Sequence, residues 1–175
     1  MQVVGLCGFG QSGKDTAFEH GLKQLGYTRI AFADALKKEI SDEFDITLSE
    51  IDSNKKFFRG LLVYWGELRR KQDPQYWIRK VSKQMTEADG KYCITDVRYV
   101  NECDFIESVF GFCIRIVRPY NHAANAAEME SITAIIDKYN PVILRNDGSE
   151  EDLGFTLVNA LREHKNINND RKGNL

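Results

Sequence analysis

The sequence predicts an α/β fold in which a mainly parallel sheet lies between two layers of helices. Short apolar runs recur along the 175 residues, and they lack the polar–apolar alternation typical of strands with one exposed face. Stretches with apolar residues at helical spacing separate these runs. A glycine-rich loop follows the first run and precedes the first helical stretch. Strands that alternate with helices join through right-handed crossovers, so we expect three layers with about five parallel strands.

Five apolar runs are expected to form the strands. They cover residues 2–7, 29–33, 92–95, 112–117 and 141–144. Gly26 is expected to end the first helix, because glycine commonly follows the last helical residue. Asn101 before Glu102 and Ser149 before Glu150 are the expected N-caps of later helices, since short polar side chains accept bonds from the first backbone N–H groups.

The length of the chain corresponds to about one domain, which we place at residues 1–165. A long helical block separates the second strand from the third and exceeds a simple crossover. We therefore expect an inserted helical subdomain at about residues 34–88. The segment 166–175 is polar and is expected to be a flexible tail.

Composition and charge exclude several classes of protein. Hydrophobic residues make up 42% of the chain and charged residues 29%, as in ordinary globular domains. The formal net charge is −2, so no nucleic-acid partner is expected. No apolar run approaches the roughly 20 residues of a membrane-spanning helix, and no signal peptide is visible at the N-terminus. We therefore expect no membrane partner.

The four cysteines, Cys7, Cys93, Cys103 and Cys113, form no C-x-x-C pair. All except Cys103 lie in apolar runs that we expect to be strands, where a thiol behaves as a small buried hydrophobic group. This usage fits a reducing compartment, and we expect a cytoplasmic protein.

The strongest signal for function is a phosphate-binding loop. Residues 8–14 fit the pattern G-x-x-x-x-G-K directly between a strand and a helix, which is the context that the motif requires. Glycines let successive backbone N–H groups surround phosphate oxygens, and the lysine reaches the β- and γ-phosphates. The candidate nucleotide-binding residues are Gly8, Gly10, Gln11, Ser12, Gly13, Lys14, Asp15 and Thr16.

Two carboxylates are candidates for the metal site. Asp15 follows Lys14 where the common motif has a Ser or Thr that binds Mg²⁺. It would orient a metal-bound water or a substrate group, or it is simply an acid favoured in a first helical turn. Asp96 ends an apolar run and resembles the Walker-B acid. Arg98 follows and is expected to face the same crevice.

Positive charge is concentrated between residues 55 and 83. This segment holds nine Lys or Arg residues against Glu67 and Asp73, a local excess of seven. Most of these cations are expected to lie on solvated helix faces. Arg69 and Arg70 lie close to Trp65 in the sequence, and we expect one of the two to bind an anion, because arginine can hold a phosphate through two hydrogen bonds.

Five blocks of residues together resemble the phage-type deoxynucleoside monophosphate kinases. They are S-G-K-D-T at 12–16, F-A-D-A-L-K at 32–37, G-E-L-R-R at 66–70 with Trp77, T-D-V-R-Y-V-N-E at 95–102 and N-D-G-S at 146–149. The resemblance covers roughly residues 12–153. It implies a P-loop kinase fold with a helical acceptor-binding subdomain and a short lid, here at about 118–130. It also implies transfer of the γ-phosphoryl group of ATP to a deoxynucleoside monophosphate, with Mg²⁺.

The motifs and the resemblance together imply roles for individual residues. The catalytic candidates are Lys14, Asp96, Arg98 and Arg118, of which Arg118 would stabilise the transition state. Asp15 and Asp96 would bind the metal ion through water. Asn146 and Gly148 would line the adenine pocket. The substrate-binding candidates are Asp34, Lys37, Arg69, Arg70, Trp77, Arg98 and Glu102.

Two blocks depart from the family pattern. Residues 64–67 read Y-W-G-E where the family often has a G-T-E order, so the choice between Arg69 and Arg70 stays open. In the lid, an H-x-S-E-like element is present only as E-M-E-S at 128–131.

Three alternatives remain. In the first, the acceptor is another small molecule, such as dephospho-coenzyme A or shikimate. In the second, the chain binds nucleotides without catalysis. The third is a P-loop ATPase that acts on DNA. A P-loop ATPase acting on DNA would have a glutamate after Asp96, where this chain has Val97. We expect in-line transfer without a covalent intermediate, because an acceptor phosphate oxygen needs no general base. The sequence leaves the oligomeric state open, and related enzymes commonly form homodimers.

Overall fold

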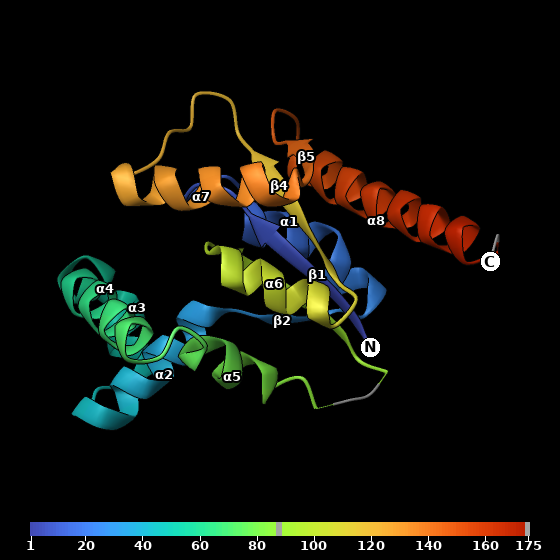
Figure 1. The fold of residues 1–175 in the computed structure, drawn as a ribbon. Helices are drawn as coiled ribbons and strands as arrows, with labels where there is room; N and C mark the ends of the chain where they lie inside the picture. Colours follow the sequence, from blue (N-terminus) through green and yellow to red (C-terminus); the bar gives the residue numbers. More distant parts are fainter. Residues whose placement is uncertain (87–88, 174–175) are drawn as a thin grey trace. The chain divides into compact units, whose positions relative to one another are not determined.

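The computed structural model describes residues 1–86 and 89–173 and divides into two compact units (Figure 1). The sheet unit combines Met1–Arg29 with Asp89–Leu175, and the helical unit is Ile30–Ala88. The second unit is thus an insertion between two parts of the first.

The sheet has five strands in the order β2-β3-β1-β4-β5. Its strands are β1 (Gln2–Cys7), β2 (Thr28–Ile30), β3 (Lys91–Val97), β4 (Phe112–Val117) and β5 (Val142–Arg145). The pairs β1–β3, β1–β4 and β4–β5 are parallel. The predicted α/β fold with a parallel sheet is therefore confirmed, and β1 and β4 have the predicted bounds.

The second strand is shorter than the predicted range 29–33. It ends at Ile30, and helix α2 begins at Phe32. Phe32 and Ala35 lie on the buried side of that helix. The prediction was wrong here because a short apolar run does not by itself distinguish the end of a strand from the start of a buried helix.

Helices cover both faces of the sheet (Figure 1). Those of the sheet unit are α1 (Lys14–His20), η1 (Leu22–Leu25), α6 (Val100–Ser108), α7 (Ala126–Tyr139) and α8 (Glu150–Gly173). Helix α1 packs on α8, and α6 packs on α7. A Cβ atom on Gly5 of β1 would lie 2.5 Å from Ile106 of α6, whereas Val4 and Leu6 lie in the core beside α1 and α8. Neighbouring residues of β1 therefore face opposite layers.

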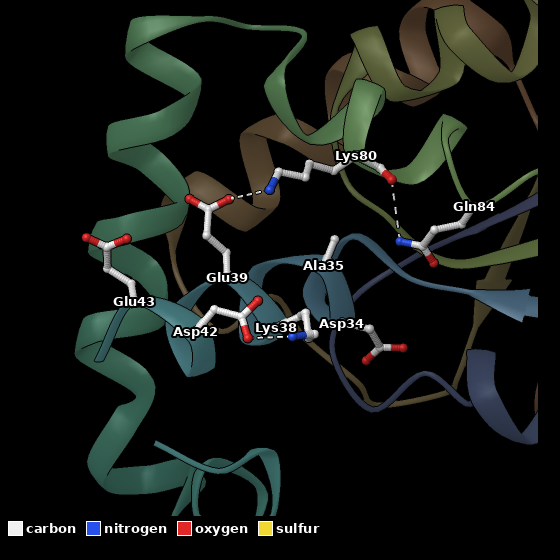
Figure 2. A pocket seen from close by; sticks show the side chains of 8 residues that line it. All are labelled: Asp34, Ala35, Lys38, Glu39, Asp42, Glu43, Lys80 and Gln84. Atoms are coloured by element: carbon white, nitrogen blue, oxygen red, sulfur yellow. Dashed lines mark hydrogen bonds and ion pairs between the residues drawn. The ribbon is translucent and has the colours of Figure 1, made fainter. Parts of the chain in front are cut away.

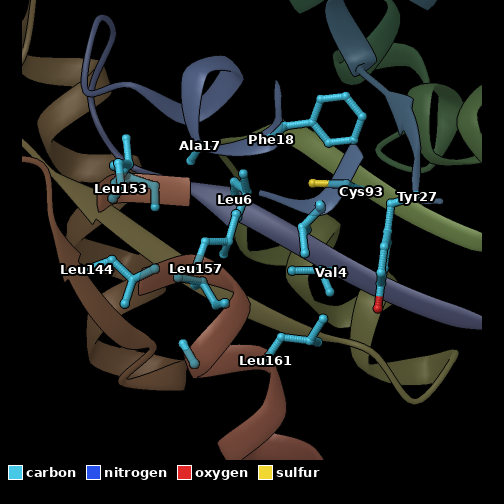
Figure 3. Close-up of a cluster of buried hydrophobic side chains, with 14 residues drawn as sticks. Val4, Leu6, Ala17, Phe18, Tyr27, Cys93, Leu144, Leu153, Leu157 and Leu161 are labelled. Atoms are coloured by element: carbon cyan, nitrogen blue, oxygen red, sulfur yellow. The ribbon is translucent and has the colours of Figure 1, made fainter. Parts of the chain in front are cut away.

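The main core lies between the sheet and the pair α1–α8 (Figure 3). Leu6 and Leu157 are fully buried, and Phe18 is 3% exposed. Cys93 belongs to this cluster, and all four cysteines are buried, as predicted for the three in strands. Burial raises the pKa of the Cys7 thiol to about 12, so the thiol is neutral and packs as an apolar group.

Two glycines allow the backbones of α1 and α8 to come into direct contact. A Cβ atom on Gly154 would lie 2.3 Å from the carbonyl oxygen of His20, and one on Gly21 would lie 2.8 Å from the carbonyl oxygen of Gly154. No side chain fits at either position without a shift of the backbone. This close contact fixes α1, and with it the loop that precedes α1.

Of the three expected caps, only Ser149 has its predicted role, since its Oγ accepts a bond from the N–H of Asp152 at the start of α8. The first helix, α1, ends at His20 before Gly21, and Gly26 instead adopts a left-handed conformation and ends η1. Asn101 is not the N-cap of α6, which already begins at Val100. The helix begins earlier because the carboxylate of Glu102 accepts the backbone N–H groups before it.

The helical unit consists of α2 (Phe32–Phe44), α3 (Leu48–Ser53), α4 (Lys55–Gln72) and α5 (Tyr76–Ser82). Helix α2 contacts each of the other three. Ile51 is fully buried and Trp77 is 2% exposed. Thr47 and Glu50 form a reciprocal capping box at the start of α3, which fixes the turn after α2.

The polar segment from residue 166, expected to be a flexible tail, continues α8 as helix as far as Gly173. Residues 174–175 lie outside the described residues. Within the described ranges, no helix combines the length and the apolar character needed to cross a membrane.

Candidate active site

The predicted phosphate-binding loop joins β1 to α1. Gly8, Gln11 and Gly13 have positive φ angles of 132°, 61° and 100°. A Cβ atom on Gly13 would lie 2.3 Å from Nδ2 of Asn146, so both the angle and the space require glycine. This backbone path is the one in which successive N–H groups can converge on an anion.

Lys14 closes over this loop. Its Nζ donates hydrogen bonds to the carbonyl oxygens of Gly8 at 3.0 Å and Phe9 at 2.8 Å, and it lies 3.4 Å from Ser12 Oγ. Burial lowers the pKa of Lys14, and the charge of Arg98 lowers it further. Burial makes the charged form of the Lys14 amine less stable than in water. A bound phosphate would stabilise this charged form, so the site favours an anion next to Lys14.

Both predicted metal carboxylates lie near Lys14. The charges of Asp15 and Asp96 each raise its pKa, which opposes the effect of burial. Asp15 Oδ1 accepts hydrogen bonds from Arg29 Nε at 2.9 Å and from Thr95 Oγ1 at 3.0 Å. The structure therefore brings the loop, the end of β3 and the start of α1 together around two carboxylates.

These carboxylates are suited to a metal ion that is held mainly by its substrate. Among the described residues, no group of three or more His, Cys, Asp or Glu side chains could hold a metal. Magnesium commonly binds through one or two carboxylates, substrate phosphates and waters. Asp96 and Asp15 provide that limited set of oxygen ligands, so the residues present fit Mg²⁺.

A carboxylate that the sequence analysis did not select, Glu128 of α7, contacts the phosphate loop. Its Oε1 accepts the N–H of Gly10 at 2.9 Å, and its Oε2 accepts the N–H of Ala124 at 2.6 Å. Asn121 donates from Nδ2 to the carbonyl oxygen of Gly10 at 2.8 Å. Both polar groups of Gly10 are thus held by the segment predicted to be the lid.

The predicted nucleotide residue Asn146 also contacts the loop. Its Nδ2 donates to the carbonyl oxygen of Ser12 at 2.9 Å, and its own N–H donates to Val117 at 2.7 Å. Gly148 lies in the turn that precedes α8. The contact of Asn146 and Gly148 with adenine stays a prediction.

The two predicted arginines of the sheet unit, Arg98 and Arg118, are both exposed. Arg98 is near enough to Lys14 to lower its pKa. Its backbone N–H donates to Glu102 Oε2 at 2.7 Å, and Glu102 is 2% exposed. The structure thus places Glu102 as a support for the segment that carries Arg98. Arg118 follows β4 at the start of the predicted lid.

The predicted substrate residues of the helical unit are divided among different surroundings. Lys37 Nζ forms an ion pair with Asp52 at 2.7 Å. Trp77 is buried, and its Nε1 donates to the carbonyl oxygen of Gly66 at 3.1 Å, so its N–H group is used within the unit. Asp34 lies on the exposed side of α2.

A pocket of about 550 Å³ lies between α2 and the region of α5 (Figure 2). Its walls are Asp34, Ala35, Lys38, Glu39, Asp42, Glu43, Lys80 and Gln84. Lys38 pairs with Asp42, and Lys80 pairs with Glu39 at 3.2 Å. Carboxylates outnumber cations in this lining, so the lining as a whole carries a negative charge.

Glu39 at the edge of this pocket joins three helices. Its Oε1 accepts bonds from Trp65 Nε1 at 2.9 Å and Arg69 Nε at 2.7 Å, and its Oε2 accepts the Tyr76 hydroxyl at 2.6 Å. Burial opposes the ionisation of Glu39, but the bonds from Tyr76, Trp65, Arg69 and Lys80 outweigh it and lower the pKa to about 2. Helical spacing places Glu39 on the buried side of α2, but no local pattern reveals donors that lie at least 26 residues away.

Comparisons with known proteins agree with this arrangement. The sequence model of the phosphomevalonate kinase family matches residues 6–112 of this chain. These residues include the phosphate loop, the helical unit and Asp96. A protein of Acanthamoeba polyphaga mimivirus, named "Putative deoxynucleotide monophosphate kinase", is 28% identical over 86% of this chain and 92% of its own length.

Two solved kinases share the fold at low sequence identity. The dephospho-CoA kinase of Campylobacter jejuni has a TM-score of 0.58 at 19% identity and covers 96% of this chain and 100% of its own. The shikimate kinase of Aquifex aeolicus has a TM-score of 0.53 at 16% identity and covers 94% of this chain and 98% of its own. These similarities show the three-layer kinase fold.

Proposed function

The chain belongs to the phosphomevalonate kinase family of P-loop kinases, and from this premise we propose that it transfers the γ-phosphoryl group of ATP to a deoxynucleoside monophosphate. The observation that carries the proposal is the phosphate loop, closed by the buried cation of Lys14 and flanked by Asp15 and Asp96. Such a loop binds the phosphates of a nucleotide, and the two carboxylates fit its Mg²⁺.

Two observations support an acceptor that already carries a phosphate. The names of the family and of the mimivirus relative, phosphomevalonate kinase and deoxynucleotide monophosphate kinase, both denote phosphorylated acceptors. The helical unit also has a local excess of positive charge between residues 55 and 83, which suits a small anion. The five sequence blocks favour the nucleotide over other phosphorylated acceptors.

The proposed reaction is a direct in-line transfer. An oxygen of the acceptor phosphate attacks the γ-phosphorus of ATP, and the bond from that phosphorus to the β–γ bridging oxygen breaks to release ADP. The acceptor oxygen is already anionic, so no side chain has to remove a proton from it. Lys14 and the loop N–H groups neutralise charge on the transferring group, and Mg²⁺ adds positive charge there when bound.

The proposed roles of the other charged residues follow from their positions. Arg98 is exposed and close to Lys14, so it is available to the transferred group. Asp96 and Asp15 would hold the metal ion through water. Arg118 would contribute from the segment after β4, and closure of this segment would exclude water from the reaction.

A specific observation favours a second candidate, transfer to phosphomevalonate, because the family description carries that name. An ADP-release assay with a panel of acceptors distinguishes the two. The panel contains the four common deoxynucleoside monophosphates, their ribonucleotide counterparts, phosphomevalonate, dephospho-coenzyme A and shikimate.

We expect turnover with at least one deoxynucleoside monophosphate. Turnover with phosphomevalonate and with no nucleotide would transfer the assignment to the second candidate. Binding of ATP in a calorimeter, without transfer to any member of the panel, would instead indicate a nucleotide-binding protein without catalysis.

A further inference from the structure

We propose that Arg69 and Lys80 together bind the phosphate of the acceptor, and that Glu39 is the positioning residue that holds these two cations. The inference rests on the proposed function only in that the acceptor carries a phosphate. It selects Arg69 rather than Arg70, and it adds Lys80 and Glu39, which the motifs did not indicate.

The carboxylate of Glu39 is fully hydrogen-bonded within the helical unit. Its side chain is 9% exposed, and each carboxylate oxygen accepts two donors, Trp65 and Arg69 on Oε1 and Tyr76 and Lys80 on Oε2. A carboxylate has about four acceptor positions, so its capacity is used within the protein. Glu39 therefore acts on a substrate only through the groups that it holds.

The side chain of Arg69 is held in one orientation. Its Nε is held by Glu39, and its guanidinium carbon lies 5.0 Å from the centre of the Trp65 ring and 5.2 Å from that of Tyr76. An ion pair and two rings thus fix the plane of the guanidinium group. Since Nε is bound to the carboxylate, the two Nη groups form the end of the planar fork that can hold two phosphate oxygens. The side chain is 28% exposed, so a ligand can reach it.

Glu39 does not balance the charge of both cations. One carboxylate, Glu39, is shared by two cations, Arg69 and Lys80, so these three side chains together carry a net charge of +1, while the charge of Glu43 also acts on Arg69. Lys80 is 46% exposed, and its Nζ lies 5.6 Å from the ring of Tyr76. A phosphate that binds Arg69 and Lys80 would complete the neutralisation of this cluster.

The physical consequence is preorganisation. A free arginine or lysine side chain loses rotamer freedom when it binds a ligand, at a cost of about 0.5–1.5 kcal/mol for each side chain. Glu39 imposes this order during folding, so the acceptor does not have to impose it. Loss of Glu39 should therefore weaken the binding of the acceptor without changing the binding of ATP.

The test compares Glu39→Gln with the wild type in the full chain, with the acceptor that gives turnover in the panel. We expect the KM for the acceptor to rise by about tenfold, the equivalent of about 1.4 kcal/mol, while the KM for ATP stays within about twofold. Asp42→Asn is the matched control, because Asp42 is an exposed carboxylate on the same helix and pairs with a lysine outside the cluster. Its kinetic constants should remain those of the wild type.

A double-mutant cycle separates positioning from a general structural role. If Glu39 acts through Arg69 and Lys80, the rise in the acceptor KM of the double variant Glu39→Gln/Arg69→Ala should be clearly smaller than the combined effects of the two single variants. Additive effects on this KM, or an equal rise in the KM for ATP, would overturn the proposal. Should Glu39→Gln fail to fold, Lys80→Met tests the same site, and an unchanged acceptor KM in that variant would also overturn it.

The two proposals fail in different ways. If a deoxynucleoside monophosphate is turned over and Glu39→Gln leaves its KM unchanged, the function stands and this inference fails. If phosphomevalonate is the acceptor and Glu39→Gln raises its KM, the inference stands and the nucleotide assignment fails. If the acceptor carries no phosphate, both fail.

Discussion

The carboxylate of Glu128 accepts a hydrogen bond from the backbone N–H of Gly10 at 2.9 Å, across 118 residues of sequence. This bond places a negative charge beside the phosphate loop, where Lys14 and Arg98 in turn stabilise the ionised carboxylate. Burial opposes ionisation of Glu128, but the bonds from Ala124 and Gly10 and these two cations lower its pKa. The loop is thus supported by a group that has the same sign of charge as its expected ligand.

Two variants of Glu128 should therefore act in opposite directions on ATP binding. Glu128→Gln keeps an oxygen for the N–H of Gly10 and removes the negative charge, so the dissociation constant for ATP should fall several-fold. Glu128→Ala removes the support of the loop as well, so the constant should rise. Calorimetric titration with ATP measures both. If both variants changed the dissociation constant for ATP equally and in the same direction, the charge of Glu128 and its hydrogen bond to the loop would not have opposite effects.

Lys14→Met should abolish transfer but preserve the fold. The methionine has a similar length without the charge, so the transition state loses its principal cation while the buried position remains filled. We expect kcat to fall by at least about 100-fold, since a single preorganised donor at developing charge contributes on that order. Lys23→Met is the control. Lys23 is exposed, and within the part of the chain that the structure describes its side chain forms an ion pair only with Glu19. Near-normal transfer by Lys14→Met would remove Lys14 from the mechanism.

Binding of ATP should be coupled to proton uptake by Lys14. Burial, followed by the charge of Arg98, lowers the pKa of Lys14 in the free protein. Bound phosphates favour the charged amine and raise the pKa again, so the complex holds more protons between the lowered value and the ordinary value of 10.5. Calorimetry at a series of pH values below 10.5, in buffers of different ionisation enthalpy, measures this uptake. The uptake should vanish in Lys14→Met, and proton release would refute the coupling.

Glu39 should make stability depend on pH in the acid range. Its pKa is lowered from 4.5 to about 2, so its contribution is complete above about pH 4.5 and is lost as the pH falls towards 2. Urea unfolding of the wild type and Glu39→Gln should therefore differ most at pH 6 and less at pH 3. A stability difference that grows as the pH falls would show that the carboxylate is not ionised in this cluster.

Gly154→Ala should destabilise the sheet unit. The new Cβ atom would lie 2.3 Å from the carbonyl oxygen of His20, which belongs to the backbone and cannot turn aside. Overpacking of this kind costs about 1–3 kcal/mol of unfolding free energy. In contrast, Gly60→Ala in α4 meets no atom within 4 Å and should be neutral or stabilise by up to about 1 kcal/mol. Urea unfolding measures both, and an unchanged midpoint for Gly154→Ala would contradict the close contact of α1 and α8.

Much of the fold could be predicted because its signals are local. The bounds of β1 and β4 follow from their apolar runs, and Ser149 caps the start of α8. The end of β2 and the cap of α6 could not be predicted in the same way. In both cases a neighbouring group, the buried face of α2 or the carboxylate of Glu102, decides between two conformations that the local sequence allows equally well.

The sequence by itself determined where the phosphate loop lies, because its glycine spacing and the following lysine are local signals. It also selected Lys14, Asp15 and Asp96, which the structure brings together. Only the tertiary structure decided that Glu39 holds Arg69 and that Glu128 supports Gly10. The sequence around a carboxylate such as Glu39 does not identify its partners. The stability of its ionised form depends on burial and on donors that folding brings from other helices.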